Sequence, residues 1–71
     1  MDKAEIDIRF TYHSPKGVQP SKYETIRQEA KELAILFDAF CPESREKSLA
    51  ITKLEEAVMW ANAAIARRED K

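Results

Sequence analysis

The stretch SREKSLAITKLEEAVMWANAAIARR, from Ser44 to Arg68, decides the fold of this chain. It contains no Gly or Pro and is rich in Ala, Leu, Glu, Lys and Arg, the residues that lose least on entering a helix. Its apolar residues recur at steps of three and four, which places them in one seam along the helix. Helices pack against one another along such seams, so the stretch predicts a long helix with a partner helix. The seam residues are Ile51, Leu54, Val58, Ala61 and Ile65.

Further apolar residues lie on the same predicted helix but outside this seam. One partner helix of ordinary width covers a single face, so a second covering surface is implied. The chain has 71 residues, near the lower limit of what folds alone, and its single cysteine, Cys41, excludes an intrachain disulfide. We therefore expect a homo-oligomer to cover the residues outside the seam, which are Leu49, Met59, Trp60, Ala63 and Ala64.

A second long helix is predicted to begin at Ser21, which forms a capping box with Glu24. The segment Cys41-Pro42-Glu43 ends this helix, and Ser44 is a suitable cap for the next one. A turn this short makes the two helices antiparallel. The seam of this helix is predicted at Tyr23, Ile26, Ala30, Leu33, Phe37 and Phe40.

Residues 2 to 13 fit two structures. Apolar residues alternate from Ile6 to Tyr12 as in a strand, but Ile6, Arg9, Phe10 and His13 would also share one helical face. A lone strand would need pairing between subunits, whereas a short helix could dock on the hairpin unaided, and we predict the helix. The predicted fold class is thus all-α, with a single helical domain over residues 1–71. The charged tail after Arg67 is expected to fray.

The segment SPKGVQP, from Ser14 to Pro20, predicts a loop with positive charge around it. Residues 9 to 27 carry four cationic side chains against one carboxylate. A nucleotide needs a flat ring for stacking, cations for its phosphates and backbone amides near a flexible loop. The residues that meet these needs are Tyr12, Lys16, Gly17, Lys22 and Arg27, with Tyr23 nearby.

Other classes of function are disfavoured by composition and spacing. The amino terminus is acidic where a signal peptide would be basic, and no apolar run approaches a membrane span, so we expect a soluble intracellular protein without a membrane partner. The net charge of −1 argues against binding DNA or RNA polymers. No His/Cys cluster has zinc-ligand spacing, so neither a metal nor another cofactor is predicted.

Paired carboxylates raise the possibility of an all-helical nucleotide hydrolase that holds magnesium, for example through Glu29 and Glu32. That chemistry needs a second Glu-x-x-Asp on a facing helix, and the sequence has none. His13 has no predicted nucleophile beside it. We therefore predict no catalytic residue. Trp60 is expected in the core or a subunit interface, while Asn62 could set oligomer register or contact a ligand.

Two segments carry a resemblance to a known family: FTYHSPKGVQPSKYETIRQEAKELA, from Phe10 to Ala34, and CPESREKSLAITKLEEAVMWANAAIAR, from Cys41 to Arg67. The chain resembles the phage anti-CBASS cyclic-nucleotide sponges. The resemblance implies a short amino-terminal helix and a long hairpin, interlocked into a hexamer. It also implies sequestration of cyclic dinucleotides and cyclic trinucleotides, without catalysis, in the cytoplasm of the infected bacterial host.

The resemblance also suggests ligand-binding residues. The family's base-stacking tyrosine matches Tyr12, and its phosphate-binding lysine matches Arg27, which keeps the charge but changes the donor geometry. Arg67 is assigned to the trinucleotide site, and further ligand-binding candidates are Lys22, His13, Ser44 and Arg45. Two alternatives remain open from the residues: a helical hairpin that binds a host protein, and a small all-α nucleotide hydrolase.

Overall fold

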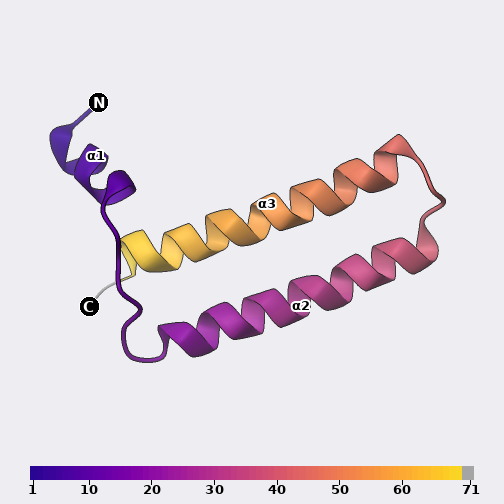
Figure 1. The fold of residues 1–71 in the computed structure, drawn as a ribbon, viewed down its shortest axis with the longest axis horizontal. Coiled ribbons are helices and arrows are strands. Elements are labelled where there is room, and N and C mark those ends of the chain that lie inside the picture. Colours follow the sequence, from indigo (N-terminus) through magenta and orange to yellow (C-terminus); the bar gives the residue numbers. More distant parts are fainter. Residues whose placement is uncertain (70–71) are drawn as a thin grey trace.

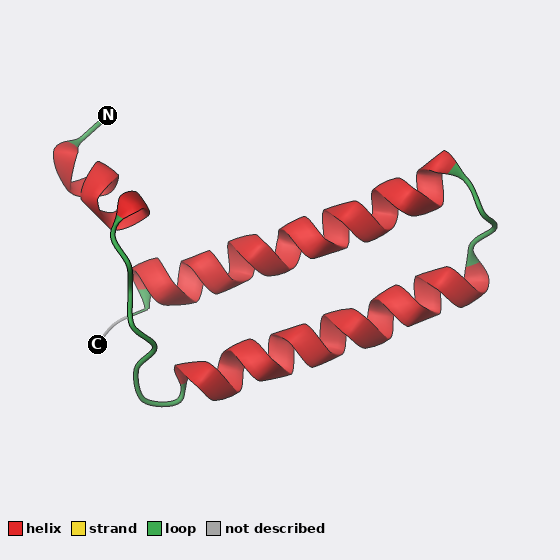
Figure 2. Ribbon diagram, viewed as in Figure 1, coloured by secondary structure: helices red, strands yellow, loops and turns green. Residues whose placement is uncertain are grey.

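The computed structural model describes residues 1–69, which form three helices without a strand (Figures 1 and 2). Helix α1 spans Lys3–Phe10, α2 spans Gln19–Phe40 and α3 spans Arg45–Arg68. The all-α prediction is confirmed, including the short helix within residues 2 to 13, and the strand alternative is wrong. None of these helices is both long and apolar enough to cross a lipid bilayer.

Helices α2 and α3 run antiparallel and pack side by side as a long hairpin (Figure 1). The predicted break and cap are confirmed, because α2 ends at Phe40 and the Ser44 side chain accepts a hydrogen bond from the Lys47 N–H at 3.1 Å. The Cys41 N–H closes the end of α2 by donating to the Phe37 carbonyl at 2.9 Å. Sequence signals at the turn therefore place this end of the hairpin correctly.

The predicted start of α2 is wrong by two residues. The helix begins at Gln19 after Val18, whose side chain makes no capping bond, and Pro20 occupies the first turn. Proline suits this position because its fixed φ is already helical and its missing N–H would have no partner there. Ser21 is consequently inside the helix, where its carbonyl accepts the Thr25 hydroxyl at 3.0 Å.

The predicted seam is confirmed on α3, where all five of its residues are half-buried. On α2 it is corrected at two positions, because Leu33 and Phe40 are exposed and Ala34 is half-buried instead. A straight helix has 3.6 residues per turn, so a strict three-and-four alternation drifts off the contact face. The hairpin interface on α2 therefore follows Ile26, Ala30, Ala34 and Phe37.

The single chain covers little of its apolar surface. Among residues 1–69 no apolar side chain is fully buried, and Trp60 is 63% exposed. The molecule is flat, with extents of 44 × 30 × 14 Å. Its accessible surface is 5723 Å², against roughly 4,500 Å² for a compact monomer of the same mass. Of the residues that we expected outside the seam, all but Ala63 are exposed.

Candidate functional site at the open end of the hairpin

Two cavities lie at the open end of the hairpin, where α1, the following loop and the end of α3 meet (Figure 1). We name them the tyrosine cavity, which Tyr12 and Tyr23 line, and the tryptophan cavity, which Trp60 lines. Arg9, Ala63 and Arg67 line both, so the two cavities share a wall. A ligand in one cavity would therefore meet cations that also serve the other.

The tyrosine cavity has a volume of about 450 Å³ and gathers four of the seven predicted ligand-binding residues. These are Tyr12, His13, Arg27 and Arg67. They come from the loop and from both long helices, so only the folded hairpin brings them together. Two phenol rings and three guanidinium groups, with Arg9 the third, can offer stacking surfaces and positive charge to a nucleotide.

Tyr12 follows α1 directly, on the extended chain that begins at Thr11. Tyr12 is 81% exposed, so most of its surface is open to a partner. Tyr23 is half-buried on the first turns of α2. An exposed ring beside cationic groups is suited to stacking against a nucleobase.

The His13 ring forms a hydrogen bond within the chain. Its Nε2 lies 2.8 Å from the Ile8 carbonyl oxygen, and because a carbonyl only accepts, the ring N–H donates. The Ile8 carbonyl is in the last turn of α1 and has no partner within the helix. His13 therefore fixes the chain after α1, beside Tyr12.

Arg27 pairs with Glu24 one helical turn away, with 2.8 Å between Nη1 and Oε1. Both side chains are mostly exposed, and an exposed pair of this kind is worth little because water and salt screen it. The guanidinium can therefore exchange Glu24 for a ligand phosphate. Arg27 also borders an apolar groove between α2 and α3, which Ile51, Leu54 and Val58 line.

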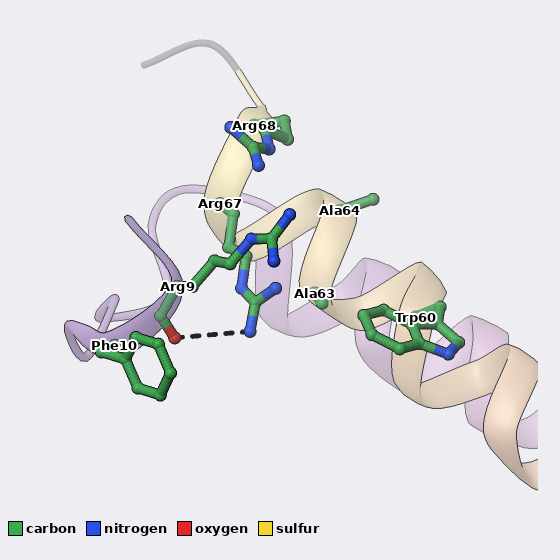
Figure 3. A pocket seen from close by; sticks show the side chains of 7 residues that line it. All are labelled: Arg9, Phe10, Trp60, Ala63, Ala64, Arg67 and Arg68. Atoms are coloured by element: carbon green, nitrogen blue, oxygen red, sulfur yellow. Dashed lines mark hydrogen bonds between the residues drawn. The ribbon is translucent and has the colours of Figure 1, made fainter. Parts of the chain in front are cut away.

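The tryptophan cavity has a volume of about 420 Å³. In the view of Figure 3, the side chains of Arg9 and Arg67 lie between the Phe10 ring on α1 and the Trp60 ring on α3. An Arg67 Nη2–H donates to the Arg9 carbonyl at 3.5 Å. Trp60 lines this cavity at the surface of the chain. Arg68 is the third cationic residue of the lining, after Arg9 and Arg67.

One carboxylate holds two of these arginines. Glu5 Oε2 accepts hydrogen bonds from Arg68 Nη2 at 2.5 Å and from Arg9 Nε at 2.7 Å. The bond from Arg68, followed by that from Arg9, lowers the pKa of Glu5 to about 2. Sequence reasoning missed Glu5; its four-residue spacing from Arg9 is a visible signal, whereas no local pattern indicates Arg68.

Lys22 lines neither cavity, and it forms an ion pair with Glu69. Gln19 Nε2 donates to the same carboxylate at 2.8 Å. The bonds from Lys22 and then Gln19 lower the pKa of Glu69. Arg68 is the last helical residue and Glu69 is the cap that follows it, while Asp70 and Lys71 lie outside the described residues, so the fraying of this tail stays a prediction.

Ser44 and Arg45 lie at the other end of α3, next to the hairpin turn, and line neither cavity (Figure 1). The Ser44 hydroxyl is engaged as the helix cap. Asn62 lines the tyrosine cavity, and its Oδ1 is buried without a hydrogen-bond partner among residues 1–69. The same part of the chain contains no cluster of three His, Cys, Asp or Glu side chains that could hold a metal ion.

Comparison with known protein families gives a match over most of the chain. The family described as Acb2/Tad1, hairpin domain, matches residues 2–66, which include all three helices except the last two residues of α3. The match also covers Tyr12 and Arg27 but ends before Arg67. Neither the curated proteins nor the solved structures contain a significant match.

Proposed function

This chain belongs to the Acb2/Tad1 hairpin-domain family of anti-CBASS cyclic-nucleotide sponges, and on that premise we propose that it sequesters cyclic di- and trinucleotides without cleaving them. The observation that carries the proposal is the tyrosine cavity, in which Tyr12, Arg27 and Arg67 meet. A base stacks on the Tyr12 ring, and the guanidinium groups bind the phosphodiesters. We assign Arg67 to trinucleotide binding, because it lies in the wall that the tyrosine cavity shares with the tryptophan cavity.

Sequestration lowers the free concentration of a messenger, which requires tight binding and slow release and needs no catalytic group. The messengers are those that bacterial cyclases make to start abortive defence. We therefore place the protein in the cytoplasm of the infected bacterium, as a phage product that keeps the signal from its effector. Its family is known for binding rather than catalysis.

The functional unit that we propose is a homo-oligomer, a hexamer by the family resemblance. The surface that a single chain exposes supports it, since that surface exceeds the value for a compact monomer by about 1,200 Å². An interface of standard size buries about 800 Å² on each partner. Ser44 and Arg45 lie far along α3 from the cavities, so they reach a ligand only from a neighbouring copy.

Two substitutions test the ligand site by calorimetry with 3′,3′-cyclic dinucleotides. Tyr12→Ala should remove stacking worth about 1–3 kcal/mol, which weakens binding by about 5- to 150-fold. Arg27→Glu should abolish binding, because it places a carboxylate where the phosphate would lie. Both variants should keep the oligomeric state of the parent, measured by light scattering.

Matched controls are available within the chain. Tyr12→Phe keeps the ring and should bind nearly as tightly as the parent. Lys53→Glu makes the same charge reversal as Arg27→Glu in another exposed pair one helical turn apart, Lys53 with Glu56, away from both cavities. Unchanged affinity in both Tyr12→Ala and Arg27→Glu would show that the site assignment is wrong.

One experiment separates this function from its rivals. The protein is incubated with a cyclic dinucleotide and magnesium and separated from free ligand; the bound fraction is then heated, and the released molecule is identified by chromatography. Intact cyclic nucleotide supports sequestration. Altered nucleotide would favour a hydrolase, and a monomeric chain that retains no nucleotide would favour a hairpin that binds a host protein.

A further inference from the structure

Glu5 lies where a bound anion would compete for arginines. Resting on the proposed function, we propose that the Glu5 carboxylate is an internal competitor: it holds Arg9 and Arg68, and a ligand phosphate must displace it to use them. The contact is thus autoinhibitory, and it sets how tightly the open end of the hairpin binds its ligand.

The contacts of Glu5 are those that a phosphate would make. A single oxygen, Oε2, accepts from Arg68 Nη2 at 2.5 Å and from Arg9 Nε at 2.7 Å. Carboxylates and phosphates bind guanidinium groups through the same charge-assisted hydrogen bonds. Both arginines line the tryptophan cavity, and Arg9 also lines the tyrosine cavity. One carboxylate therefore pairs with cations from the lining of both cavities.

The competitor can be displaced. The Glu5 side chain is 24% exposed, so a ligand can approach its oxygens. Exchange of one anion for another at Arg9 and Arg68 leaves no guanidinium unpaired, so the change is less unfavourable than simple rupture of the pairs. Glu69, the other carboxylate at this end, is held by Lys22 and Gln19 and does not compete for these arginines.

A phosphate that displaces Glu5 would take over its bridge between α1 and α3, because Arg9 lies on α1 and Arg68 on α3. This helix has eight residues and no buried side chain, and helices so short are marginal on their own. Among residues 1–69, its polar bonds to α3 are the Glu5–Arg68 pair and the bond from Arg67 to the Arg9 carbonyl. The α1 segment is therefore a strap that Glu5 holds in the free protein and that a phosphate between Arg9 and Arg68 would hold in the complex.

The variant Glu5→Gln tests the proposal, with Asp7→Asn as its matched control. Asp7 is exposed on the same helix and forms no ion pair with a described residue, so both variants change the net charge equally. By calorimetry with cyclic di- and trinucleotides, Glu5→Gln should bind about two- to fivefold more tightly than Asp7→Asn, the range expected for one exposed ion pair. A merely structural Glu5 would give the opposite sign, because loss of α1 docking would weaken binding.

Hydrogen exchange gives a second measurement. In Glu5→Gln without ligand the α1 amides should exchange faster than in the parent, and added ligand should restore their protection, because the phosphate replaces Glu5 between α1 and α3. If the parent binds and Glu5→Gln binds no more tightly than Asp7→Asn, this inference fails and the proposed function stands. If the parent binds no cyclic nucleotide, both fail.

Discussion

The two ends of the hairpin are each closed by one buried polar side chain, but they are built differently. At the turn end, Lys47 is 8% exposed and pairs with Asp38 at 2.8 Å and with Glu43, at most nine residues away in sequence. Hydrogen bonds to Asp38 and then Glu43 raise its pKa. At the open end, Gln19 bonds to the Ile65 carbonyl and to Glu69, 46 and 50 residues away.

This difference assigns different roles to the two ends. The turn end can form from one continuous segment, so it closes the hairpin without help from the rest of the chain. The open end forms only after α2 and α3 have aligned, and its contacts are polar and mostly exposed. Contacts of this kind open more readily than an apolar core, which suits the end that contains both cavities.

The largest effect is expected from Gln19→Ala, which removes the closure of the open end. Gln19 Oε1 accepts the Lys16 N–H at 2.9 Å, and its Nε2 donates to Glu69 at 2.8 Å and more weakly to Ile65. Loss of these bonds from a buried residue should lower the free energy of unfolding by about 2–3 kcal/mol. Urea denaturation at fixed protein concentration measures it.

Gln28→Ala is the control for that substitution. Gln28 lies on the same helix, but it is exposed, and within residues 1–69 its side chain bonds only to Glu32, at 3.1 Å. Its removal should change stability by no more than about 0.5 kcal/mol. Equal losses in the two variants would contradict the view that non-local contacts close the open end.

A smaller effect is expected at the turn end from Ser44→Ala. The Ser44 hydroxyl caps the Lys47 N–H, and loss of such a cap lowers stability by about 1 kcal/mol. Ser44→Gly also removes the hydroxyl but should lose only a few tenths of a kcal/mol, because glycine is itself tolerated at this position. Thermal unfolding of both variants should rank them in this order, and the reverse order would mean that the cap does not hold this end.

The difference between local contacts at the turn end and non-local contacts at the open end also explains which features the sequence could predict. Ser44 and Pro42 act through neighbours a few residues away, and the seam of α3 shows in a repeat of three or four residues, so these predictions from local patterns are confirmed. The prediction for the start of α2 is wrong because Ser21 satisfies a local capping rule, while Gln19 bonds to Ile65 on α3 and to Glu69 directly after it. Local patterns contain no information about such a contact.

The candidate site shows the same limit. The sequence predicted a cationic and aromatic cluster, and the structure brings Tyr12, Arg27 and Arg67 to one cavity. It could not indicate that Glu5 and Glu69 would hold neighbouring cations, since these pairs are 63 and 47 residues apart. Which cations a ligand finds free therefore depends on the tertiary structure.

The smallest effect is expected from the titration of Glu5. The pair of Glu5 with Arg68 lies at the open end, so this titration tests that end of the hairpin alone. The pKa of Glu5 falls from its ordinary 4.5 to about 2 in the folded chain. A group with a lowered pKa stabilises the fold fully above its ordinary value and loses that contribution as pH falls through its folded value. Docking of α1 should thus weaken as pH falls from 4.5 to about 2.

Trp60 can report this titration, because it is the only tryptophan and lines the cavity beside Phe10. Its fluorescence in the parent, minus that in Glu5→Gln, should be constant above pH 5 and shrink as pH falls toward 2, where about half of the Glu5 carboxylates are protonated. Added salt should reduce the difference, since the pair is partly exposed and therefore screened. A difference that does not shrink as pH falls toward 2 cannot come from the Glu5 charge and would mean that another contact docks α1.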